Sequence, residues 1–177
     1  MFNQLINIFW TVIVFSVTGH YWGQYFAEKH SLWLVYIYIG VSVFAYTIPA
    51  RWVSFLTLSS NRRIYEMIGI RAMRWLVQDG MFVSRVNRSL GKKHRRISGT
   101  ASARAYLTTI AVQERFHYSC FVFFALSMAS ALGSGKVLAA ISIMLCNIVY
   151  NVYPILLQQY NRLRIKNLLN QSAIQKM

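Results

Sequence analysis

Four long apolar runs constrain the fold of this chain more than any other feature of its sequence. They cover Leu5–Tyr21, Leu32–Leu56, Phe116–Leu132 and Val137–Leu157. Each is close to the roughly 20 residues that a helix needs to cross a bilayer. Lipid offers the backbone no hydrogen-bond partners, so unbroken runs of this length favour helices over strands. The sequence therefore predicts an all-α integral membrane protein, a single membrane domain over residues 1–177 with about four transmembrane helices.

The charge of the chain fits a membrane protein better than a nucleic-acid-binding protein. Only 13% of its residues are charged, yet 19 Lys and Arg face 4 Asp and Glu, which gives a net charge of +15. Such a charge can attract nucleic acid, but in membrane proteins it reflects cationic cytoplasmic loops beside anionic lipids. The apolar runs leave no room for a soluble nucleic-acid-binding module. We therefore expect lipids with anionic headgroups as partners, and no nucleic acid.

The basic residues also predict an orientation. Thirteen lie in Arg51–Arg115 and four follow the last apolar run, whereas Lys29 and Lys136 stand alone in the other two loops. The positive-inside rule then puts segment 57–115, the tail 158–177 and both chain ends in the cytoplasm. The predicted location is the cytoplasmic (inner) membrane of a bacterium. The first run has no basic residue before it and no cleavage site, so we expect it to be a retained helix.

The middle segment divides into two parts. In Asn61–Gln78, apolar residues recur at a helical period with arginines between them, which predicts an amphipathic helix on the cytoplasmic membrane surface. Asn87–Ala103 is polar, basic and contains Gly and Ser, so it is expected to be a mobile loop near anionic headgroups.

Glu114 and His117 form a Glu-x-x-His pair where the third run begins. Residues three apart share one face of a helix. A carboxylate beside an imidazole can orient it as a general base. The alternative is an interfacial ion pair in which the carboxylate meets an arginine. A single Glu-x-x-His is too little for a carboxylate-bridged dimetal site, so no metal is expected.

A second polar cluster lies at the end of the fourth run and just after it. Its members are amides, a tyrosine and arginines: Asn151, Gln158, Gln159, Tyr160, Asn161, Arg162 and Arg164. Amides can bind sugar hydroxyls, and arginine can hold a phosphate or carboxylate with two hydrogen bonds. The alternative is an ordinary interfacial end of a helix, with arginines on its cytoplasmic side.

Three stretches together resemble one known family. They are the tail Asn151–Arg164, the pair Glu114 and His117, and Ile70-Arg71 followed by Asp79-Gly80. In these stretches the chain is similar to the glycosyl-4,4'-diaponeurosporenoate acyltransferases of the staphyloxanthin carotenoid pathway. Gln159 and Leu163 stand where that family has Arg and Pro.

The resemblance implies a membrane enzyme that transfers a fatty acyl group to a hydroxyl of a glycosylated carotenoid or another glycolipid. His117 would be the general base and Glu114 would orient it. The polar head or the phosphates of the donor would be bound by five residues: Asn161, Arg162, Arg71, Gln158 and Asp79. No cofactor is implied beyond the acyl donor as a co-substrate, for which acyl-CoA is one candidate. The alternative is a non-enzymatic subunit that packs in a larger membrane protein complex.

Overall fold

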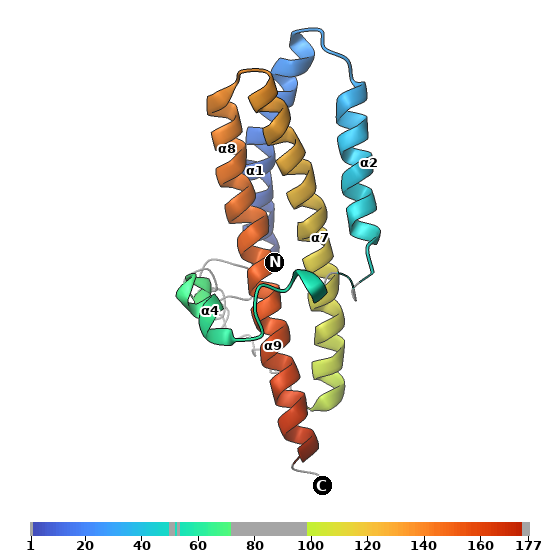
Figure 1. The fold of residues 1–177 in the computed structure, drawn as a ribbon, viewed down its shortest axis with the longest axis vertical. Helices are drawn as coiled ribbons and strands as arrows, with labels where there is room; N and C mark the ends of the chain where they lie inside the picture. Colours follow the sequence, from blue (N-terminus) through green and yellow to red (C-terminus); the bar gives the residue numbers. More distant parts are fainter. Residues whose placement is uncertain (1, 50–51, 53, 72–98, 175–177) are drawn as a thin grey trace.

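The computed structural model describes residues 2–49, 52, 54–71 and 99–174, and this part of the chain is helical without strands (Figure 1). The prediction of an all-α fold is confirmed for these residues. The elements in chain order are α1 (Phe2–Ala27), α2 (Trp33–Thr47), the short 3-10 helix η1 (Ser54–Leu56), α4 (Arg62–Met67), α7 (Thr100–Gly133), α8 (Val137–Asn147), the π-helical segment η2 (Ile148–Val152) and α9 (Tyr153–Ile174).

Three helical stretches in the described part are long and apolar enough to cross a membrane. They are Leu5–Ala27 in α1, Thr100–Gly133, which is α7, and Val137–Gln171, which runs through α8, η2 and α9. At 1.5 Å per residue, a helix of 34 residues is about 50 Å long, well beyond the ~30 Å hydrocarbon core. The sequence therefore predicted these helices but not their full length, because α7 begins 16 residues before the third apolar run and α9 continues past the fourth run to Ile174.

The second apolar run differs from its prediction. Instead of extending to Leu56, α2 has 15 residues and ends at Thr47. Ile48 is extended, with φ −57° and ψ 126°, because the ring of Pro49 disfavours helical backbone in the residue before it. A helix of 15 residues is only about 22 Å long. The predicted helix over 32–56 is therefore wrong in its extent, and α2 falls short of membrane-spanning length.

The predicted amphipathic helix is likewise shorter than expected. Asn61 caps its start, since the side-chain Oδ1 accepts a hydrogen bond of 3.0 Å from the backbone N–H of Arg63. The helix ends at Met67, and Gly69 takes φ +87°, a left-handed conformation that suits glycine. A continuous helix from Asn61 is thus wrong at residues 68–69, and residues 72–78 lie outside the described residues.

The expected mobile loop over Asn87–Ala103 also needs a correction. Residues 87–98 lie outside the described residues, but α7 already begins at Thr100. The first turns of this helix lie before the apolar run. They contain Ala103 and the fully buried Ile110, which pack with Ile165 of α9. Packing against α9 therefore orders residues whose polar composition suggested a loop.

Helix α7 is the central element of the bundle. It packs against α2, α8 and α9, while α1 lies mainly against α8 and α4 packs on α9 (Figure 1). Hydrogen bonds between helices accompany the apolar contacts. Trp22 Nε1 donates to Ser127 Oγ at 3.1 Å, the hydroxyls of Tyr21 and Ser130 are 2.7 Å apart, and Ser119 donates to the Ser42 carbonyl at 2.6 Å.

The first testable prediction concerns the bond between Trp22 and Ser127. Trp22→Phe keeps an aromatic ring in the core but removes the indole N–H, so Ser127 loses its donor. Hydrogen bonds between membrane helices are worth about 0.6–2 kcal/mol, and we expect a loss of that size in the free energy of unfolding in micelles. Trp33→Phe is the matched control, since the Trp33 side chain is 72% exposed. Equal stability of the two variants would contradict the prediction.

Candidate functional site

The site begins at an irregularity in the last long helix. Residues Ile148–Val152 form a π-helical segment just before Pro154. Proline has no N–H to offer the carbonyl four residues earlier, which belongs to Tyr150. A π segment accommodates such a defect, and these segments are frequent at functional sites. The local result is that the buried Asn151 and the Tyr150 carbonyl face α7, where the imidazole of His117 meets both of them.

A chain of side-chain amides determines which ring nitrogen of His117 carries the proton. Asn147 Nδ2 donates to the Phe121 carbonyl at 3.2 Å, and Asn151 Nδ2 donates to Asn147 Oδ1 at 2.8 Å. Since a carbonyl only accepts, this chain leaves Asn151 Oδ1 as an acceptor facing His117 Nδ1 at 3.5 Å. The neutral imidazole that satisfies it carries its proton on Nδ1. In that tautomer Nε2 carries the lone pair that can accept a proton.

Glu114 lies one helical turn before His117 but bonds to a different helix. Its carboxylate, only 1% exposed, forms an ion pair with Arg162 Nη1 of α9. The other guanidinium nitrogen, Nη2, donates to Thr57 Oγ1 at 2.6 Å. The interpretation of Glu114 as half of an ion pair with an arginine therefore describes its contacts, and its carboxylate does not orient the imidazole directly.

Gln159 is a buried residue of the site that belongs to the polar cluster seen in the sequence but was not among the predicted substrate-binding residues. Its side chain is 1% exposed and joins three segments of the chain. Its Nε2 donates to the Leu56 carbonyl at 3.1 Å and to the Tyr118 hydroxyl at 3.2 Å, and its Oε1 accepts from Leu58 N and Tyr65 Oη, each at 3.0 Å. A signal was present, because Gln159 lies three residues before Arg162 and so shares its face.

These contacts hold residues 54–61, which we call the connector, across α7 and α9 (Figure 1). The connector follows α2 and leads into α4. Thr57 binds Arg162, Leu56 and Leu58 bind Gln159, and Ser59 exchanges hydrogen bonds with Tyr65 of α4 at 2.9 and 3.1 Å. Burial raises the pKa of the Tyr65 hydroxyl, which is consistent with its role as a neutral donor.

A second ionic cluster lies on α4. Glu66 Oε2 accepts from Arg71 Nη2 at 2.8 Å, and Glu66 Oε1 accepts from the Tyr160 hydroxyl at 3.1 Å. Arg62 also donates to that hydroxyl at 2.9 Å, with its guanidinium 5.0 Å from the ring centre. Partial burial acts to raise the pKa of Glu66, but the bonds from Tyr160 and Arg71 outweigh it and hold the pKa below its ordinary value.

The structure thus brings together some of the predicted site residues and separates others. Glu114 and Arg162 are in contact, and His117 lies one turn further along the same helix. Gln158 bonds to Gln113 of α7 at 2.9 Å, so it lies in the same seam between α7 and α9. Arg71 belongs to the cluster around Glu66. Asn161 is half-buried on α9, and Asp79 lies outside the described residues.

The arrangement can do two things chemically. It presents an imidazole nitrogen that can act as a base in a polar seam between helices. It also holds the Arg162 guanidinium against Glu114, which lies one helical turn from that imidazole. No group of three His, Cys, Asp or Glu side chains that could hold a metal ion occurs within the described ranges. Within the described residues, the fold and the site define a helical membrane protein with a half-buried histidine close to a largely buried ion pair at one end of its apolar helices.

The family follows from comparison with known proteins. Residues 49–171 match the family model of glycosyl-4,4'-diaponeurosporenoate acyltransferase. The match covers more than half of the chain and includes the connector, α4, α7 and the helix that carries Arg162. The chain belongs to this family, as the resemblance of its three stretches suggested. No curated protein and no solved structure shows a significant match to the chain.

The second prediction concerns the ion pair. Arg162→Met leaves the Glu114 carboxylate buried without a counter-charge, which typically costs about 3–5 kcal/mol. The double variant Glu114→Gln/Arg162→Met removes both charges and should recover most of that stability. Thermal unfolding in detergent measures both effects. Arg164→Met, an exposed cation two residues away, is the control and should unfold like the wild type. A double variant no more stable than Arg162→Met would contradict the account.

Proposed function

We propose that this chain is a membrane enzyme that transfers a fatty acyl group to a hydroxyl of a glycosylated carotenoid or a related glycolipid. The reaction would take place at the end of the bundle where the connector crosses α7 and α9. The match of residues 49–171 to a family of acyltransferases is the observation that carries this proposal. The matched region contains the imidazole, the amide chain and the guanidinium that such a reaction can use.

The chemistry assigns His117 the role of general base. The Nδ1–H tautomer favoured by Asn151 leaves Nε2 able to accept the proton of the sugar hydroxyl. As the proton leaves, the hydroxyl oxygen attacks the acyl carbonyl carbon and forms the new ester bond. The bond from that carbon to the donor's leaving group breaks, and His117 returns the proton to the leaving group. With a thioester donor of the acyl-CoA class, the products are an ester and a thiol.

Arg162 is the proposed binding residue for a charged or strongly polar part of a substrate. Its guanidinium makes contact with Glu114 and Thr57, and these two bonds fix the direction in which it can approach a ligand. Glu114 is then a positioning residue that acts through Arg162. Asn161, Gln158, Arg71 and Asp79 complete the proposed set, with the amides suited to sugar hydroxyls and Arg71 to phosphate.

The proposed topology has both ends of the chain in the cytoplasm of a bacterium, with the apolar helices in its cytoplasmic membrane. The alternating direction of α1, α2, α7 and α8 fits this topology, because the N-terminus and the C-terminal end of α9 then lie toward the same end of the bundle (Figure 1). The excess of Lys and Arg in 51–115 and after 157 supports the cytoplasmic side for that end.

The third prediction tests the base. His117→Ala should lower the rate of acyl transfer by about 10²–10⁴-fold, the usual contribution of a general base. The measurement is the rate of ester formation by the purified protein, with glycosylated carotenoid and an acyl thioester in micelles. Val112→Ala is the control, since this residue of α7 is 41% exposed. If a folded His117→Ala protein transfers at the wild-type rate, His117 is not the base.

The fourth prediction tests the amide chain that positions the base. Asn151→Leu removes the acceptor that faces His117 Nδ1 and should lower kcat while leaving KM nearly unchanged. Asn151→Asp keeps an acceptor oxygen toward His117 Nδ1 but replaces the donor to Asn147 with a second acceptor, so the folded protein should retain a higher kcat than Asn151→Leu at a cost in stability. The contrary outcome is that the two variants are equally unstable and that assay at low temperature restores kcat in both. Asn151 would then have a purely structural role.

A further inference from the structure

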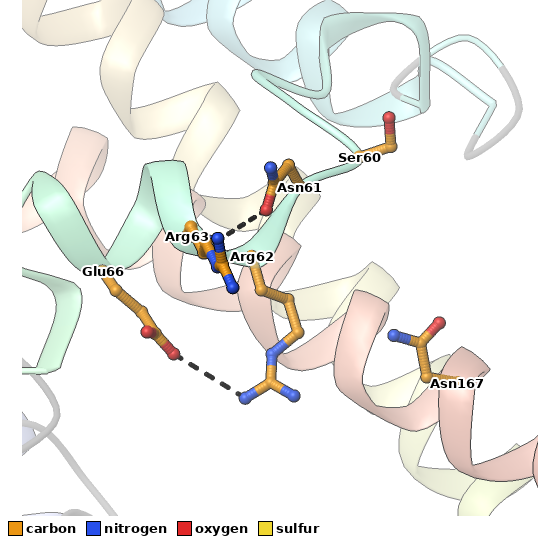
Figure 2. Close-up of a pocket in the computed structure, with 6 residues that line it drawn as sticks. All are labelled: Ser60, Asn61, Arg62, Arg63, Glu66 and Asn167. Carbon is orange, nitrogen blue, oxygen red and sulfur yellow. Dashed lines mark hydrogen bonds and ion pairs between the residues drawn. The ribbon is translucent and has the colours of Figure 1, made fainter.

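A polar hollow lies beside α4, apart from the seam that contains His117. It has a volume of about 610 Å³ and is open on one side. Six polar residues line it, five from the connector and α4 and one from α9: Ser60, Asn61, Arg62, Arg63, Glu66 and Asn167. Figure 2 shows that Arg62 extends from α4 into the space between Glu66 and Asn167. Among the proposed substrate-binding residues, Arg71 lies beside this hollow through its ion pair with Glu66, and none of them lines it.

The lining carries more donors than acceptors. Glu66 is the acidic residue of the set, and both of its oxygens already accept bonds, from Arg71 and from Tyr160. Arg62 Nε is buried and has no hydrogen-bond partner among the described residues. The side-chain oxygen of Asn61 accepts from the backbone N–H of Arg63, so the amide N–H groups are the donors that this lining residue has left.

Arg63 adds a second guanidinium. Its side chain is exposed, and within the described ranges it makes no ion pair. Two guanidinium groups, two amides and a hydroxyl therefore surround a space in which the single carboxylate is already neutralised. This donor set suits an anion with several oxygens, and guanidinium groups bind phosphate with paired hydrogen bonds.

The position of the hollow indicates where such an anion comes from. On α4, Met67 is 86% exposed and Ile64 and Ile68 are also exposed, and on the connector Phe55 is 85% exposed. Apolar side chains beside cationic ones are typical of surfaces that lie in the membrane interface. The hollow therefore opens near the level of lipid headgroups, on the face that the positive charges assign to the cytoplasm.

We propose that the hollow lined by Arg62, Arg63, Asn61 and Asn167 is a phosphate-binding site. The phosphate can belong to a phospholipid headgroup or to a soluble phosphate-bearing compound, and the two sources share the same contacts. Binding there places the phosphate next to Tyr160, which links Arg62 and Glu66 to the helix that carries Arg162. The site is distinct from the proposed catalytic seam and exists whether or not acyl transfer occurs.

The test compares binding of three probes to the full chain in phosphate-free maltoside micelles. The probes are phosphatidylglycerol, coenzyme A and inorganic phosphate, and the readout is native mass spectrometry with a titration of thermal stability. Arg63→Gln is the main variant because Arg63 makes no ion pair with a described residue. Arg62→Gln is the second variant, since Arg62 also pairs with Glu66 at 3.8 Å. Arg164→Gln is the control, since it removes an equal charge from an exposed position on α9.

The expected result is one bound phosphate compound whose Kd rises about tenfold in Arg63→Gln, the loss of one charge-assisted contact of about 1.4 kcal/mol, and is unchanged in Arg164→Gln. An effect on phosphatidylglycerol alone assigns the site to a headgroup, and an effect on coenzyme A or phosphate alone assigns it to a soluble compound. No binding of any probe, or equal weakening by Arg63→Gln and Arg164→Gln, would overturn the proposal. Binding is measured without transfer, so neither outcome bears on His117.

Discussion

The ion pair between Glu114 and Arg162 is the interaction on which the functional end of this molecule depends. The carboxylate is almost fully buried, and a buried charge is tolerated only when it is paired. Its partner comes from α9, so the pair fixes how α7 and α9 meet. Through Thr57 the same guanidinium also holds the connector. The Gln159 amide then adds bonds to both sides of Thr57, so that α4 and the connector are placed by two residues of α9.

His117, the proposed base, lies one turn further along α7, beside the π-helical segment η2 that precedes α9. Pro154 has no N–H for the Tyr150 carbonyl, and the helix is π-helical over the residues just before it. The Asn151 amide belongs to that π-helical segment and faces His117. The two features are thus complementary. A buried charge pair sets the distance between the helices, and a break in regular bonding presents polar groups inside their seam. The family match over residues 49–171 is the basis for interpreting this geometry as that of an acyltransferase.

The sequence predicted the long apolar helices, because hydrophobic runs are local signals. Rare charges are local signals too, and for that reason it singled out Glu114, His117 and the polar cluster at the end of the fourth run as candidate site residues. It did not predict that α2 would end at Thr47 or that α7 would begin at Thr100. Those ends depend on Pro49 and on packing of Ala103 and Ile110 against Ile165, which is a contact distant in sequence. Spacing alone also could not decide whether Glu114 faces His117 or an arginine, since the answer lies on another helix.

The central claim is that this chain adds an acyl group to a membrane-embedded glycolipid. The most direct measurement is mass spectrometry of lipids and pigments extracted from cells with and without the chain, supplied with the glycosylated carotenoid. The account predicts a product heavier than the acceptor by one fatty acyl ester, present only with the chain. An identical lipid and pigment profile in the two extracts, together with loss of a stoichiometric membrane complex when the chain is removed, would contradict it and indicate a structural subunit.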